Sequence, residues 1–228
     1  MKDMSTPRKI FAIGGLAAGI LMLAFGIATI ALGFNGRSTV NDNLKQEAIV
    51  GSPDMTPSGI AAEAKKAGLT NVSLPTCSVA GQTVDNGSRA RCFAQYMRIH
   101  TLEASGGYTY AQMGRFQAKP GTPASQLAKG GGTDNTQYAA IDATTKQPVA
   151  NGARNIWVTE TALTSALNLA YTAQQISLFS IVVGVGLLLS GVGFIVLTLA
   201  GALSHITAPA TKREKTPTMK PATGGPAV

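Results

Sequence analysis

The stretch ISLFSIVVGVGLLLSGVGFIVLTLAGAL, residues 176–203, decides the fold of this chain. It is apolar over its whole length, and no Asp, Glu, Lys or Arg occurs between Glu160 and His205. The hydrocarbon core of a bilayer is roughly 30 Å thick and is crossed by about 20 helical residues. A second apolar stretch of sufficient length, IFAIGGLAAGILMLAFGIATIALGF, occupies residues 10–34. The sequence therefore predicts two transmembrane helices, 10–34 and 176–203.

The composition of the 228-residue chain agrees with this prediction, because 45% of the residues are hydrophobic and only 13% are charged. Soluble domains contain about 25% charged residues. A signal peptide is the alternative for the first apolar stretch, since it follows the basic start MKDMSTPRK. Its apolar run is longer than the usual run of about 7–15 residues, and no A-x-A cleavage site follows it. We therefore expect an uncleaved membrane anchor.

The distribution of charge predicts the topology. Both ends of the chain, 1–9 and 204–228, are short and carry more Lys and Arg than Asp and Glu. Cytoplasmic segments beside membrane spans are enriched in Lys and Arg, so both termini are expected in the cytoplasm. Residues 35–175 are then extracytoplasmic, and the chain is a two-span protein of the plasma membrane. The tail 204–228 is low in hydrophobicity and is expected to be disordered.

Cys77 and Cys92 are the only cysteines and both lie in the outer segment, with 14 residues between them. An even number of cysteines confined to the oxidising side of a membrane predicts a disulfide. In the chain-entropy model a loop of this size contributes about 3 kcal/mol to stability. Two buried free thiols are the alternative. A zinc site formed by this pair is not expected, because no nearby histidine completes four ligands.

Small residues follow one face of each predicted span. They are Gly15, Gly19, Gly26 and Gly33 in the first span and Ser177, Gly184, Gly191 and Thr198 in the second. Small residues allow membrane helices to approach closely. Either the two spans pack on each other as a hairpin, or the faces serve dimerisation or docking to another membrane protein. Gly186 and Gly193 lie off this face and leave room for a second contact surface.

Two short helices are predicted in the outer segment. TPSGIAAEAKKAG begins with Thr56 as a cap, followed by Pro57 at the first helical position. SRARCFAQYMRIHTLEASGG begins at Ser88, which can cap a helix over 88–104, and ends in a glycine pair that suits a helix terminus.

The remaining outer residues separate into a loop and a helix. Residues 119–155 are rich in Gly, Pro, Thr, Gln and Asn, which is typical of a long flexible loop. A helix is expected from about Trp157 through the second span. The predicted fold class is mainly α: a two-span transmembrane hairpin with a small disulfide-linked helical extracytoplasmic domain and a disordered C-terminal tail.

The run HTLEASGGYTYAQMGR, residues 100–115, is the best candidate for a functional site. His100 shares one helical face with Phe93, Tyr96 and Met97, which predicts a packed histidine with Glu103 as its partner. His205 lies beyond the second span, so the two histidines cannot share an iron site of the type that needs both. The chain also lacks the common hydrolase, phosphate-loop and zinc-protease motifs. We therefore predict no catalytic residue, no metal site and no cofactor.

The same run carries a resemblance. Its pattern, H-x-L-x-A-S-G-G-x-T-Y-A-x-M-x-R, includes His100, Glu103, Gly106, Gly107, Tyr108, Tyr110 and Arg115. It resembles a family of two-span actinobacterial membrane proteins, as do LKQEAIVGSPDM (44–55) and SLFSIVVGVGLLLSGVGFIVL (177–197). Members are often labelled aromatic ring-opening dioxygenase, a label that implies an iron enzyme and that the residues here do not support. The resemblance implies a two-span topology and a cell-envelope location, without a known activity.

Three functions follow as expectations. The first is a non-enzymatic accessory or scaffold protein that associates with another membrane or envelope complex, or with a second copy of itself. The second is a module that binds a lipid or an envelope intermediate in a pocket lined by Phe93, Tyr96, Met97 and Tyr110. An enzyme, the third, would need polar groups converging on His100 in an open cleft. Nucleic acid is not an expected partner, because residues 35–175 carry nearly balanced charge, 12 Lys and Arg against 9 Asp and Glu.

Overall fold

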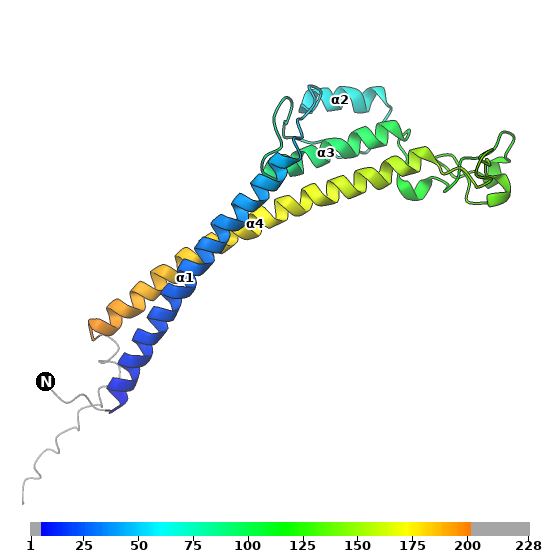
Figure 1. The fold of residues 1–228 in the computed structure, drawn as a ribbon. Helices are drawn as coiled ribbons and strands as arrows, with labels where there is room; N and C mark the ends of the chain where they lie inside the picture. Colours follow the sequence, from blue (N-terminus) through cyan, green and yellow to red (C-terminus); the bar gives the residue numbers. More distant parts are fainter. Residues whose placement is uncertain (1–5, 202–228) are drawn as a thin grey trace, which may run out of the picture. The chain divides into compact units, whose positions relative to one another are not determined.

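The computed structural model describes residues 6–201, which are mainly helical. The helices, in chain order, are α1 (Thr6–Gln46), α2 (Pro57–Lys66), α3 (Gly87–Ala104) and α4 (Gly152–Leu199), shown in Figure 1. Three single-turn 3-10 helices lie between α3 and α4: η1 (Tyr110–Gln112), η2 (Ala124–Gln126) and η3 (Thr136–Tyr138). Within the described residues, β-pairing is limited to isolated bridges. The predicted mainly helical class is confirmed.

The described residues form two compact units, one made of 6–26 with 186–201 and the other of 27–185. The predicted tail 204–228, with His205, and residues 1–5 lie outside the described residues. Helices α1 and α4 contribute to both units, and both are long and apolar enough to cross a membrane. Large apolar side chains stay exposed along them, among them Phe34 on α1 and Phe179 on α4. Exposed apolar surface of this extent is suited to lipid rather than to water.

In the first unit, α1 and α4 pack through glycine. A Cβ atom added to Gly19 would lie 3.0 Å from the main-chain oxygen of Gly191. A Cβ atom added to Gly191 would lie 2.8 Å from the main-chain oxygen of Gly19. A side chain at either position would therefore force the two backbones apart. On the other side of α4, a Cβ atom added to Gly186 or Gly193 has no described atom within 4 Å outside the neighbouring backbone of α4 itself.

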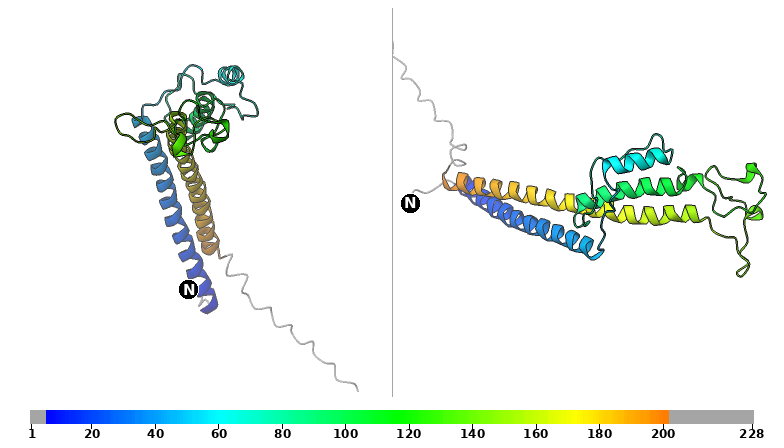
Figure 2. Two further views of the ribbon diagram at one scale, coloured as in Figure 1. Left: turned by 90° about the vertical axis from the view of Figure 1, so that its right-hand side faces the viewer. Right: turned by 90° about the horizontal axis from the view of Figure 1, so that it is seen from above.

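In the second unit, α1 and α4 again pack closely, and α3 packs along α4. A Cβ atom added to Gly33 would lie 2.6 Å from the main-chain oxygen of Ser177. Gln174 of α4 donates to the Asn41 side chain of α1 at 3.2 Å. At the start of α3, a Cβ atom added to Gly87 would lie 2.8 Å from the Cα atom of Tyr171. Figures 1 and 2 show α2, α3 and the first half of α4 lying side by side.

The core of the second unit lies between α2, α3, α4 and the end of α1. Its largest completely buried side chains include Tyr96, Ile60, Ile99, Val79 and Val84. The predicted disulfide joins Cys77 to Cys92, and the described residues contain no free cysteine. The disulfide ties the loop before α3 to the first turns of that helix.

The helix starts agree with the sequence in part. Thr56 caps α2 as predicted, accepting from the Gly59 main chain at 3.0 Å, and Pro57 follows it. The cap of α3 is Asn86 and not Ser88, because the Asn86 side chain accepts from the Arg89 main chain at 3.0 Å. Helix α4 begins at Gly152, five residues before the expected start at Trp157.

The segment after α3 differs from the predicted flexible loop over 119–155, because main-chain hydrogen bonds fold it onto itself. Phe116 and Thr133 exchange two such bonds, of 3.0 and 2.9 Å. Val149 donates to Ala140 at 2.8 Å and accepts from Gln117 at 2.9 Å. The bonds join residues far apart in the sequence, and no regular strand extends beyond each bridge in this segment. We call residues 108–151 the outer lobe.

Candidate functional site

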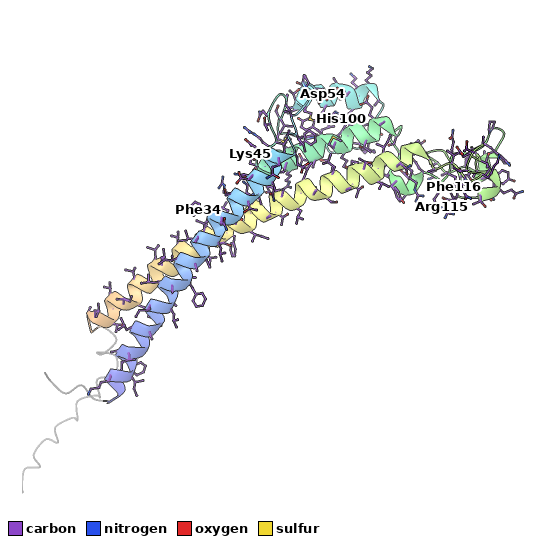
Figure 3. The ribbon with its side chains drawn as sticks, in the orientation of Figure 1. Phe34, Lys45, Asp54, His100, Arg115 and Phe116 are labelled. Atoms are coloured by element: carbon purple, nitrogen blue, oxygen red, sulfur yellow. A yellow bond between two sulfur atoms is a disulfide. The ribbon has the colours of Figure 1, made fainter. Side chains whose placement is uncertain are left out.

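Three titratable side chains lie close together between α2 and α3. One of them, His100, belongs to the run 100–115, the best candidate for a functional site in the sequence. The Nε2 atom of His100, near the end of α3, lies 2.9 Å from Oδ2 of Asp54 and 3.4 Å from Oε2 of Glu63. Asp54 lies in the turn before α2 and Glu63 lies on α2. Figure 3 shows Asp54 and His100 close to each other on neighbouring segments. We call these three residues the His100 cluster.

The His100 cluster is partly shielded from water. The side chains of His100, Asp54 and Glu63 are 27%, 31% and 33% exposed. One ligand-type atom from each of the three lies within 4.8 Å of the other two. Within residues 6–201, neither carboxylate forms an ion pair with a Lys or an Arg. The cluster thus combines two carboxylates with a single basic group.

Hydrogen bonds and charge shift two pKa values here. The pKa of Asp54 is lowered, chiefly by a hydrogen bond from the Ser52 side chain and further by His100. The pKa of Tyr96 is raised, first by burial and then by the negative charge of Asp54. Tyr96 therefore stays protonated, and its hydroxyl donates a hydrogen bond to the main-chain oxygen of Cys77 at 2.5 Å. Tyr96 is thus bonded to the disulfide loop and lies within the electrostatic influence of Asp54.

The partner of His100 differs from the prediction. Glu103, the predicted partner, is exposed on α3, and in the described part of the chain it forms no hydrogen bond or ion pair with His100. Asp54 and Glu63 take its place. Asp54 and Glu63 precede His100 by 46 and 37 positions in the sequence. The helical spacing around His100 therefore could not predict either contact. The prediction that the chain has no metal site did not consider these two carboxylates.

The glycine pair of the run 100–115 ends α3. Gly106 and Gly107 have φ angles of +66° and +85°, a conformation that glycine adopts without strain. The chain then turns so that the main-chain oxygen of Tyr108 accepts from the Trp157 indole at 2.9 Å and from the Ser105 hydroxyl at 2.6 Å. The turn thereby fastens the end of α3 to the start of α4.

The other signature residues lie outside the His100 cluster. Tyr108 and Tyr110 are 38% and 43% exposed. The Arg154 guanidinium lies 4.0 Å from the centre of the Tyr110 ring. Arg115 binds Asp134 within the outer lobe, with its Nε 3.2 Å from a carboxylate oxygen. The signature residues therefore do not form one site: His100 belongs to the His100 cluster, and the others lie on the surface of α3, at its end, in a cation–π pair and in a lobe contact.

The pocket expected for a ligand-binding module is filled. Tyr96 is completely buried and Phe93 is 8% exposed, so both contribute to the packed core. Tyr110 lies instead at an open groove of about 400 Å³ on α4, which is mostly apolar. The groove is lined by Tyr110, Trp157, Val158, Thr161, Ala162 and Ser165. We call it the α4 groove.

The predicted helix-packing residues follow one face of each long helix. Gly19, Gly26 and Gly33 are buried on α1, and Gly15 is half-buried. On α4, Ser177, Gly184 and Gly191 are buried, and Thr198 is half-buried. Gly19 with Gly191, and Gly33 with Ser177, are contacts between α1 and α4 of the same chain. These four residues are therefore engaged in packing the two helices of one chain.

The chain matches no family model, no curated protein and no solved structure. Its function is therefore proposed from the geometry of the described residues.

Proposed function

We propose that this chain is a non-enzymatic integral membrane protein of the actinobacterial cell envelope that acts as an accessory or scaffold subunit. The observation that favours this over a ligand-binding module is the packed core at Phe93 and Tyr96, where the module would need an apolar pocket. The exposed apolar faces of α1 and α4 support its place in a bilayer. The actinobacterial assignment rests on the resemblance of residues 100–115.

The proposal includes a topology. Residues 10–34 and 176–203 span the plasma membrane, both termini are cytoplasmic, and residues 35–175 are extracytoplasmic. The disulfide of this segment supports its exposure to an oxidising compartment, because disulfides are rare in the cytosol. The basic residues near both ends of the chain support cytoplasmic termini.

The partner is proposed to bind the side of α4 that carries Gly186 and Gly193. Outside the neighbouring backbone of α4 itself, no described atom lies within 4 Å of a Cβ atom at either position, whereas Gly191 is engaged with α1. Two glycines seven positions apart lie on the same side of a helix and allow another membrane helix to approach closely. A second copy of this chain is the homodimeric form of the same proposal.

A lipid or envelope intermediate is the alternative ligand, and the α4 groove favours it. The groove is mostly apolar. The Arg154 guanidinium stacks on the ring of Tyr110, which lines the groove. The Nε atom of Arg154 is buried without a hydrogen-bond partner. An acyl chain in the groove with an anionic group at the Arg154 guanidinium would match the apolar lining and the positive charge at Tyr110.

The test is purification of the tagged chain from its native membrane in mild detergent, with mass spectrometry of proteins and lipids. The variant Gly186→Leu/Gly193→Leu is compared with Gly14→Leu, which also adds a side chain where no described atom lies within 4 Å of the Cβ atom. A stoichiometric partner retained by Gly14→Leu and lost by the double variant is the expected result.

Two other outcomes contradict the accessory role. A chain that emerges without a protein partner but with a defined lipid supports the α4 groove as the functional site. A chain that emerges with neither, and runs as a monomer, removes the basis for the partner surface at Gly186 and Gly193.

A further inference from the structure

We propose that the His100 cluster binds a divalent transition-metal cation of the zinc type and thereby fastens α2 to α3. The site would use Nε2 of His100 and one carboxylate oxygen each of Asp54 and Glu63. This inference does not depend on the accessory function, since it concerns only the interior of the second unit.

The distances within the cluster fit a shared cation. Zinc is held at about 2.0–2.2 Å by histidine nitrogen and carboxylate oxygen, so neighbouring ligand atoms in a tetrahedral site are about 3.3 Å apart. The distances from His100 Nε2 to the Asp54 and Glu63 oxygens, 2.9 and 3.4 Å, lie on either side of this value. All three ligand atoms lie within 4.8 Å of one another. The two separations from His100 therefore already suit a shared cation, and the Asp54 and Glu63 oxygens, which are at most 4.8 Å apart, would close onto it by side-chain rotation.

Charge provides an independent argument. With a neutral imidazole the cluster has two negative charges, and with a protonated imidazole it still has one. No Lys or Arg of the described chain forms an ion pair with either carboxylate. Each side chain is 33% exposed or less, so solvent screens the repulsion only in part. A divalent cation would neutralise both carboxylates and accept the lone pair of a neutral imidazole.

The ligand set favours zinc over other common cations. Calcium takes six to eight oxygen ligands and magnesium prefers an octahedral shell of oxygen, so an imidazole is a poor ligand for both. Non-haem iron oxygenases use two histidines and one carboxylate, whereas this cluster has the opposite ratio. Three protein ligands leave the fourth position of a tetrahedral zinc open, and the partial exposure of all three side chains admits water there.

The backbone holds the Asp54 turn in place. A Cβ atom added to Gly59 would lie 2.4 Å from the main-chain oxygen of Asp54, so the turn closes onto α2 only because residue 59 is glycine. The next residue, Met55, is 3% exposed, and its main-chain oxygen accepts from the Ser78 hydroxyl and the Val79 main chain, each at 3.2 Å. The aspartate is therefore positioned before any cation arrives, which lowers the ordering cost of binding.

The test uses the full-length chain in detergent, freed of metal by chelation and titrated with Zn²⁺ in a calorimeter. Wild type is compared with Glu63→Gln and His100→Gln. Glu103→Gln is the matched control, because it neutralises an acidic residue on α3 outside the cluster, and His205→Gln controls for the other histidine. We expect one Zn²⁺ per chain, affinity weakened by about tenfold or more in the two cluster variants, and unchanged affinity in both controls.

Co²⁺ substitution keeps the proposal testable if His100→Gln fails to fold. Wild-type chain loaded with Co²⁺ should show the visible absorption of a four- or five-coordinate ion without the charge-transfer band of thiolate, and Glu63→Gln should lose it. Absence of stoichiometric Zn²⁺ binding, or binding that Glu63→Gln and His100→Gln leave intact, overturns the proposal and makes the cluster an ion pair. Preference for Ca²⁺ over Zn²⁺ overturns it as well.

Discussion

Tyr96 shows how one buried side chain connects the core to the disulfide loop. Its ring is completely buried, and its hydroxyl donates to the main-chain oxygen of Cys77. Tyr96→Phe leaves that oxygen without this donor, so we expect the free energy of unfolding to fall by about 1 kcal/mol. Chemical unfolding in detergent measures it. Tyr108→Phe, which alters an exposed ring, should change stability much less, and equal losses would argue against the role of the hydrogen bond.

The pKa of the Asp134 carboxyl group provides a test of whether the outer lobe is folded as described. Its pKa is lowered, first by a hydrogen bond from the Arg115 main chain and then by the Arg115 side chain. A lowered pKa means that this group stabilises the lobe above the pKa of an unfolded aspartate, about 3.9. The contribution is lost as the pH falls through the lower, folded pKa.

Carboxyl NMR of the chain in micelles should therefore find Asp134 titrating below about 3.9. Arg115→Gln should raise its pKa only part of the way, because the main-chain donor remains. A pKa of Asp134 at or above the ordinary value would show that the lobe is not folded as described.

The residue scale also shows where sequence patterns fail. Helical spacing places Glu103 near His100, but spacing along one helix says nothing about the side chains that another helix brings. Asp54 and Glu63 reach His100 only because α2 packs on α3. The prediction of the α3 cap was wrong for a simpler reason. Asn and Ser are both favourable cap residues, so the sequence alone does not distinguish Asn86 from Ser88.

Gly33 permits a prediction for the packing of the two long helices. Its added Cβ would meet the Ser177 main-chain oxygen at 2.6 Å, so Gly33→Leu must push α1 away from α4. Overpacking of this kind costs about 1–3 kcal/mol. Unfolding by SDS in mixed micelles should show the loss. Gly14→Leu, where an added Cβ atom meets no atom outside the backbone of its own helix, is the control, and a loss as large there would contradict the packing of Gly33 against Ser177.

The disulfide provides a second prediction for the helical elements. Cys77→Ser/Cys92→Ser should lower the stability of the second unit by about 3 kcal/mol, the chain-entropy value for a loop of this length. Thermal unfolding followed by circular dichroism measures it, and a reducing agent should reproduce the loss in wild type and leave the double variant unchanged. A reductant effect on the double variant would point to a different cause.

The elements differ in how far the sequence predicts them. Helix α2 is predictable because its cap, its first proline and its apolar positions are local signals. The long helices are predictable because apolar composition alone sets them apart. The outer lobe is not, because its hydrogen bonds pair residues such as Gln117 with Val149, and its glycines and polar residues also occur in unstructured loops.

At the scale of the whole molecule, thiol labelling tests the proposed topology. Ser125→Cys introduces a free thiol on the exposed outer lobe, since both native cysteines are in the disulfide. A membrane-impermeant maleimide should label it in intact cells. Thr216→Cys, in the C-terminal tail, should react only after permeabilisation. Labelling of Thr216→Cys alone in intact cells would reverse the proposed orientation.

The length of α4 limits the electrostatic influence of the membrane surface on the outer lobe. From Gly152 to the proposed membrane boundary at residue 176, the helix axis measures about 36 Å at 1.5 Å per residue. Head-group charge is screened over about 8 Å at physiological ionic strength. With α4 upright at that boundary, Arg154 and the α4 groove lie beyond the electrostatic reach of the bilayer. A lipid bound there would have to be extracted from its leaflet or handed over by a carrier, and its arrival would be insensitive to the surface potential of the membrane.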